Sequence, residues 1–178
     1  MSVSRRIIKV GLSEQEVDRA IREVAEYKRN FLRKVDLLRE KIAERIASEA
    51  KTGFNGAVVD DLINGGEKLA NVDVSIGSSV KHGSMTIVIA NGEDAVWVEF
   101  GTGVYHNNTA GSSPHPRGAE LGFTIGGYGK GLGKRQTWGY YEDGELKLTR
   151  GTPARMPMER AFLSVCNEIP EIAREVFG

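Results

Sequence analysis

The sequence predicts an α+β fold, with a long N-terminal helix and a C-terminal helix packed on a small antiparallel sheet. Three observations predict it. An apolar stripe with steps of three and four residues runs through 13–51, β-branched segments follow within 71–100, and helical spacing returns from 157. Elements in this order favour helices gathered on one face of an antiparallel sheet. The 178 residues fit a single domain, 1–178.

Residues 13–51 are predicted to form one helix. Ser13 and Glu16 have the spacing of a capping box, and Gly53 is expected to stop the helix. At ~1.5 Å per residue the helix is ~57 Å long, which exceeds a small domain, so part of it should pack on another element or another subunit. Lys28 interrupts the apolar stripe, which consists of Val17, Ile21, Val24, Phe31, Leu32, Val35, Leu38, Ile42 and Ile46.

The sheet is expected within residues 71–100 and 138–150. Alternating apolar residues predict a strand at 72–76, and β-branched runs predict strands at 85–90 and 95–100. Asn91-Gly92 is a tight-turn dipeptide, so the last two of these are expected to pair as an antiparallel hairpin. Residues 138–150 form a second hairpin around Asp143-Gly144. Residues 53–70 favour a short helix or a turn.

An extended loop and the C-terminal helix complete the chain. Ten of the 37 residues in 101–137 are glycine, and a loop of this length is usually functional or disordered. The helix is expected at 157–177, with Pro157 in its first turn and a kink or division at Pro170. Cys166 lies in the apolar pattern of this helix and is expected to be a small core residue.

Composition excludes several classes of protein. The formal net charge is zero, so the general basic excess of a nucleic-acid-binding protein is missing. Residues 1–51 hold 13 Lys/Arg against 9 Asp/Glu, and residues 52–114 hold 2 against 7. This alternation suits either complementary surfaces on neighbouring copies or ordinary solvated surface. A single cysteine excludes an internal disulfide. No apolar run predicts a membrane span or a signal peptide, which indicates a chain made and kept in a cytoplasm.

Candidate catalytic groups are few. The Gly-rich stretch 126–137 resembles a phosphate-binding loop, but Tyr128 and Arg135 stand where that motif needs Gly and Ser or Thr. His106 and His115 share the long loop without the partners of a zinc site. Glu99, at the end of the predicted third strand, has no visible partner for general-base chemistry. Its carboxylate is expected instead to accept hydrogen bonds from turn N–H groups or from Thr102. No catalytic, metal-binding or cofactor-binding residue is predicted.

Several segments together resemble one protein family. Ala95-Val-Trp-Val-Glu-Phe-Gly-Thr-Gly103 resembles a signature of the head–tail connector, or tail-completion, proteins of long-tailed bacteriophages. His115-Pro-Arg-Gly118 is similar to the loop segment of that family, and Trp138-Gly-Tyr-Tyr141 to its aromatic strand. Gly151-Thr-Pro-Ala-Arg-Met-Pro-Met158 resembles its closing element, although Met156-Pro-Met158 departs from the usual Pro-Phe-Met.

The resemblance implies a structural virion protein of the head–tail neck, without enzymatic activity or cofactor, assembled in the bacterial cytoplasm. Such proteins form rings, commonly six-fold, and contact adaptor or stopper proteins, tail-tube proteins and, non-specifically, DNA in the lumen. The alternatives are a minor tail protein or tube terminator, a DNA-contacting protein, and a nucleotide-binding or hydrolytic enzyme. The implied signature and assembly residues are Trp97, Glu99, Phe100, Gly101, Thr102, Gly103, His115, Pro116, Trp138, Pro153, Ala154, Arg155 and Met158.

Overall fold

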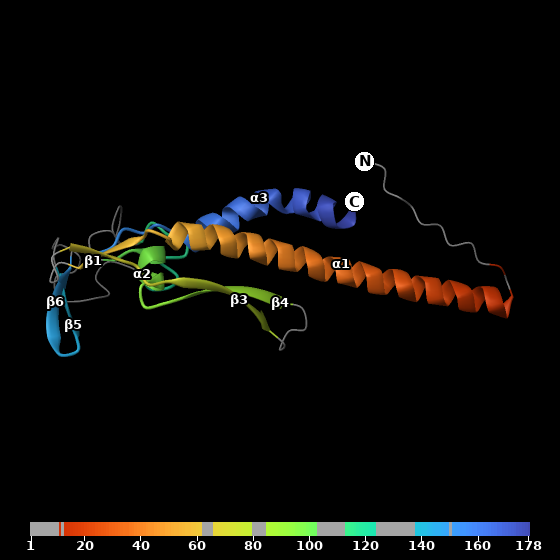
Figure 1. Cartoon of the computed structure of the whole chain (residues 1–178), viewed down its shortest axis with the longest axis horizontal. Coiled ribbons are helices and arrows are strands. Elements are labelled where there is room, and N and C mark those ends of the chain that lie inside the picture. Colours follow the sequence, from red (N-terminus) through yellow and green to blue (C-terminus); the bar gives the residue numbers. More distant parts are fainter. Residues whose placement is uncertain are drawn as a thin grey trace.

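The computed structural model describes residue 11 and residues 13–61, 66–79, 85–102, 113–123, 138–149 and 151–178. The predicted α+β class is confirmed, since a long N-terminal helix and a C-terminal helix accompany small antiparallel sheets (Figure 1). The elements in chain order are α1 (Glu14–Phe54), β1 (Val58–Asp61), β2 (Gly66–Leu69), β3 (Asp73–Ser79), β4 (Met85–Asn91), α2 (Ala95–Phe100), β5 (Trp138–Glu142), β6 (Glu145–Thr149) and α3 (Pro157–Phe177).

The long N-terminal helix begins at the predicted cap. The Ser13 hydroxyl accepts the Glu16 N–H at 3.3 Å and donates to the Glu16 carboxylate at 2.7 Å. These hydrogen bonds lower the pKa of Glu16 below its usual value. The expected stop at Gly53 is wrong, because α1 continues to Phe54. Gly53 instead permits close packing, since a Cβ there would lie 2.7 Å from the Cβ of Pro157 at the start of α3.

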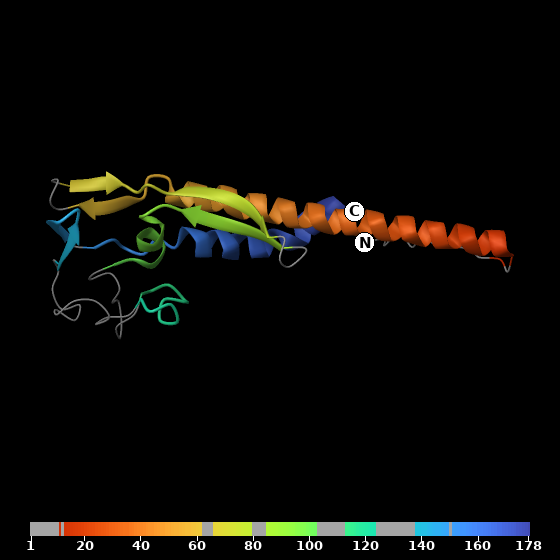
Figure 2. The same cartoon turned by 90° about the horizontal axis from the view of Figure 1, so that it is seen from below.

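The C-terminal helix packs antiparallel along the C-terminal half of α1 (Figures 1 and 2). Ion pairs of 3.0 Å join Lys41 to Glu175 and Arg45 to Glu168 across this interface. The helix α3 runs through Pro170 as one element, so it is not divided there. The expected burial of Cys166 is wrong: its side chain is exposed, because Ala161 and Val165 form the buried face of α3.

The strands form three separate two-stranded antiparallel sheets, β1–β2, β3–β4 and β5–β6. The hairpin β5–β6 turns at Asp143 and Gly144 as predicted, and both residues have positive φ. Residues 58–61 form strand β1, which corrects the expected helix or turn. The predicted pairing of 85–90 with 95–100 is also wrong, because β4 pairs with β3, in a register that places Val74 opposite Ala90.

Residues 95–100 form the short helix α2, although a strand was predicted there. Gly92, with φ of 141°, turns the chain sharply after β4, and a Cβ at this position would lie 2.0 Å from the Asn71 carbonyl oxygen. The buried carboxylate of Asp94 then accepts the Asn71 N–H at 2.9 Å. Ala95, Val98 and Glu99 are consequently buried, at the spacing of one helix face.

A small core lies where these elements meet. Phe54, Ala57 and Val98 are buried against one another. Five partly buried residues from four parts of the chain surround them, namely Ala70, Val72, Val74, Ala90 and Met158. This core fixes α2 between the C-terminal end of α1, the inner face of β3–β4 and the beginning of α3.

Candidate functional site: the junction of α2 and α3

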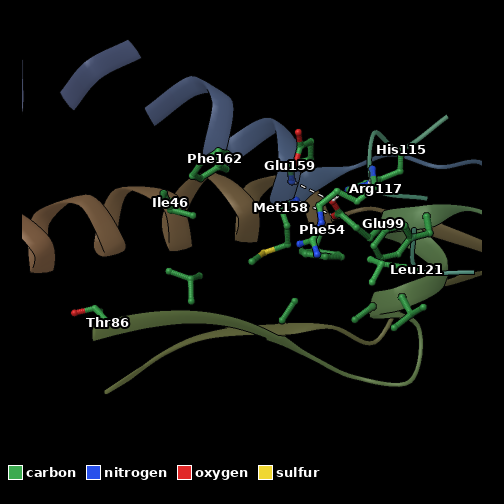
Figure 3. Close-up of a pocket in the computed structure, with 15 residues that line it drawn as sticks. Ile46, Phe54, Thr86, Glu99, His115, Arg117, Leu121, Met158, Glu159 and Phe162 are labelled. Atoms are coloured by element: carbon green, nitrogen blue, oxygen red, sulfur yellow. Dashed lines mark hydrogen bonds and ion pairs between the residues drawn. The ribbon is translucent and has the colours of Figure 1, made fainter. Parts of the chain in front are cut away.

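Three of the segments that carry the family resemblance contact one another around α2. Hydrogen bonds and ring contacts connect this helix to the segment 113–123 and to residues 151–158, which lead into α3. Three motif segments that lie far apart in the sequence therefore form one junction (Figure 3). We call this contact between α2, 113–123 and 151–158 the junction.

Glu99 caps the N-terminus of α3. Its carboxylate accepts the backbone N–H of Met158 at 2.9 Å and that of Glu159 at 3.0 Å. The N-cap residue of α3, Met156, has a left-handed backbone with φ of 54° and supplies no side-chain cap. Since the first N–H groups of a helix lack partners inside it, a carboxylate at this end satisfies both their hydrogen bonding and the helix dipole.

The buried imidazole of His115 holds Glu99 from the other side. His115 Nε2 lies 3.2 Å from Glu99 Oε1, and the backbone N–H of Arg117 donates to His115 Nδ1 at 3.0 Å. Because Nδ1 accepts a hydrogen bond, the network assigns the proton of the neutral ring to Nε2, which donates to the carboxylate. Glu99 thereby receives three hydrogen bonds, and both nitrogens of His115 are engaged within the fold.

Aromatic stacking joins the segment 113–123 to α2. The ring of Phe100 stacks on Phe123 with centroids 4.3 Å apart and planes 6° from parallel, and it contacts the His115 ring at the same distance. The Ser113 hydroxyl donates to the Phe100 carbonyl. Phe123 and Ser113 were not singled out from the sequence, because no local spacing connects them with Phe100.

Backbone contacts hold residues 151–156 against the end of α2. The N–H of Thr102 donates to the Thr152 carbonyl at 2.8 Å, and the N–H of Thr152 donates to the Thr102 hydroxyl at 2.8 Å. Gly101 has a φ of 75°, and a Cβ there would lie 2.8 Å from the backbone nitrogen of Ala154. The glycine of the signature is therefore required both by its backbone conformation and by this close approach.

Glu99 accepts hydrogen bonds as predicted, but the predicted donors, the turn N–H groups and Thr102, are wrong. The carboxylate accepts N–H groups of α3 and the His115 ring, whereas Thr102 bonds to Thr152. Among the other signature residues, Trp97, Pro116 and Pro153 are exposed. Trp138 is the first residue of β5. Gly103, His106 and the Gly-rich stretch 126–137 fall outside the described residues.

A groove of about 470 Å³ opens beside the junction, between the inner face of β4 and the helices α1 and α3 (Figure 3). Its walls are mainly apolar and include Ile46, Val88 and Phe162, while Glu99 and His115 lie at one end. The described residues contain no cluster of His, Cys, Asp and Glu suited to hold a metal ion. In the same part of the chain, no helix has the length and apolar character of a membrane span.

Comparisons with known proteins add no relative. No protein-family model matches the chain, and no significant match was found among curated proteins or solved structures. The resemblance to phage neck proteins thus rests on the sequence motifs alone.

Proposed function

We propose that this chain is a structural protein of a long-tailed bacteriophage, which completes the tail or neck and joins head to tail as a subunit of a ring. The observation that carries the proposal is the junction. Glu99 of the Trp-Val-Glu-Phe-Gly segment, His115 of the His-Pro-Arg-Gly segment and Met158 of the closing segment lie in direct contact. Three segments that resemble parts of one family signature thus meet in one structural unit, which supports the proposal.

The chemistry of the junction supports a structural role over a catalytic one. A general base needs a free lone pair directed at a substrate. The carboxylate of Glu99 is buried and receives hydrogen bonds from Met158, Glu159 and His115. The His115 ring is held on both nitrogens. These groups hold the N-terminus of α3 against α2, which is a structural role.

The shape of the molecule also supports a subunit of an assembly. At ~1.5 Å per residue, the 41 residues of α1 span ~61 Å and the 21 residues of α3 span ~31 Å. The N-terminal half of α1 extends beyond α3 (Figures 1 and 2) and carries exposed apolar side chains. Exposed apolar surface of this extent marks a site of association.

The proposal includes partners and a location. The chain forms a ring with copies of itself, hexameric by analogy with the family it resembles, and meets adaptor or stopper proteins on one side and tail-tube proteins on the other. It resides in the virion, where its contact with DNA in the lumen is non-specific. A minor tail protein or a tube terminator is the second candidate, since the same shape suits a ring at the end of a tail tube.

A null mutation in the phage that encodes the chain tests the proposal. Electron microscopy of the lysate should show filled heads and complete tails that remain separate, and supplying the wild-type chain from a plasmid should restore joined particles. Tails of abnormal length would favour the terminator instead. Normal numbers of joined, infectious particles from the null phage would refute the proposal.

A further inference from the structure

One exposed apolar surface lies on the N-terminal half of α1. Val17, Ile21 and Val24 are 41%, 60% and 53% exposed, and they continue the apolar stripe of the half of α1 that packs on α3. The helix α3 ends near Phe31, since the rings of Phe31 and Phe177 are 5.8 Å apart. The next residue of the stripe, Lys28, has no ion-pair partner among the described residues. We call Val17, Ile21, Val24 and Lys28 the α1 ridge.

A second exposed apolar surface lies on the β3–β4 hairpin. Met85, Ile87 and Ile89 are 42%, 37% and 40% exposed, because they alternate along β4 with residues that face the core. The partner strand places Gly77 opposite Ile87, which keeps this face flat. Asp73 lies on the same face, opposite Asn91, at the end of the apolar row. We call Met85, Ile87, Ile89 and Asp73 the outer strip.

The carboxylate of Asp73 is open to a further cation. Its side chain is 72% exposed, and its ion-pair partner, Lys51, is 3.8 Å away and 60% exposed. A pair of this kind is weak. A second lysine can therefore approach Asp73 without breaking a strong contact.

The two surfaces match in order and in length. The α1 ridge presents three apolar residues and then a lysine, and the outer strip presents three apolar residues and then an aspartate. Val17 to Lys28 spans ~16 Å along a helix. Met85 to Asn91, which lies opposite Asp73, spans ~20 Å along a strand. A helix laid on this face thus places its apolar residues on the strip and its lysine near the aspartate.

We propose that the α1 ridge of one copy packs on the outer strip of the next copy, with Lys28 against Asp73. One chain cannot make this contact with itself, because the N-terminal half of α1 extends away from β3–β4 (Figures 1 and 2). The contact joins two different surfaces, and repeated contacts of this kind close into a ring when the rotation between copies allows it. The inference rests on the self-assembly proposed above and names the surfaces that achieve it.

Charge reversal tests the polar part of the contact. Sedimentation velocity of the full-length chain should show that Lys28→Glu and Asp73→Lys each weaken self-association by about fivefold. The double variant should recover most of that loss, because it restores the pair with its signs exchanged. Arg29→Glu and Glu93→Lys are matched controls: both change exposed charges next to the two surfaces and should leave association unchanged. Single variants that behave as the wild type, or a double variant without recovery, would overturn the contact.

Cysteine cross-linking tests the apolar part. In a Cys166→Ser background, Ile21→Cys and Ile87→Cys chains should form disulfide-linked dimers when they are mixed, while neither should do so alone. Dimers of Ile21→Cys alone would show that α1 pairs with α1. Absence of mixed dimers from a protein that does associate would show that another surface is used. Either result overturns the contact.

The outcomes separate this inference from the proposed function. Self-association through other surfaces contradicts the ridge–strip contact and leaves the neck assignment standing. A chain that stays monomeric at every attainable concentration also contradicts the contact, whereas the neck assignment is tested independently by the particle inventory of the null phage.

Discussion

At the scale of single residues, the contacts of Glu99 explain its role in the fold. Its position before Gly101-Thr102 suggested a carboxylate that accepts hydrogen bonds from the following turn. The carboxylate instead serves the N-terminus of α3, about 60 residues later in the chain, and the His115 ring holds it there. The residue type could be interpreted from the sequence, but its donors could not, because they depend on tertiary packing.

Removing this cap should be costly. We expect Glu99→Ala to lower the free energy of unfolding by about 3 kcal/mol, since two N–H groups of α3 and the buried His115 lose their acceptor. Glu99→Gln keeps one acceptor oxygen and should cost about half as much. Urea denaturation measures the free energy of unfolding of both variants. The control is Glu93→Gln, which changes an exposed carboxylate next to α2. A loss below about 0.5 kcal/mol for Glu99→Ala would contradict the capping role.

Gly101 offers a second test at this scale. Gly101→Ala combines an unfavourable backbone conformation with a Cβ placed 2.8 Å from the Ala154 nitrogen. Gly56→Ala is the matched control, because Gly56 has a similar φ of 72° and no atom within 4 Å of its added Cβ. We expect about 1 kcal/mol for Gly56→Ala and at least about 3 kcal/mol for Gly101→Ala, by urea denaturation. Equal losses would show that residues 151–156 do not pack closely on α2.

At the scale of elements, the periodicity of apolar residues predicted the two long helices. Both helices were located within a few residues, because a stripe over many turns is specific. The strand prediction for Ala95–Phe100 was wrong, because six mostly apolar residues show neither a helical nor a strand period. The turn at Gly92 and the buried Asp94 instead start a helix there. The predicted pairing partner of β4 was also wrong. The dipeptide Asn91-Gly92 leads into helix α2, and β4 pairs with β3, the strand that precedes it in the chain.

The orientation of α3 can be tested at Cys166. The side chain is exposed in the structure, although the sequence suggested a core position. We expect a maleimide to label Cys166 in the native protein about as fast as in urea. In a Cys166→Ser background, Val165→Cys should react only after unfolding, since Val165 is fully buried although it is the adjacent residue of the helix. Slow labelling of native Cys166 would mean that α3 is rotated or that this face is covered by another copy.

At the scale of the whole molecule, the long helix α1 is only partly covered by the rest of the chain. The sequence indicated that the helix at 13–51 exceeds a small domain, so that part of it should pack on another element or another subunit. The two halves of α1 differ: α3 and β3–β4 cover its C-terminal half, and its N-terminal half, which carries exposed apolar side chains, extends past them. Which half is covered could not be derived from α1 alone, because it depends on where α3 begins, at the junction held by Glu99.

A cryo-EM map of the neck of the virion in which we propose that this chain resides is the most direct test of the proposed function. The account predicts a ring of identical copies between the portal and the tail tube, with α1 of each copy lying on β3–β4 of its neighbour. A neck without this chain, or with one isolated copy that lacks rotational symmetry, would contradict it.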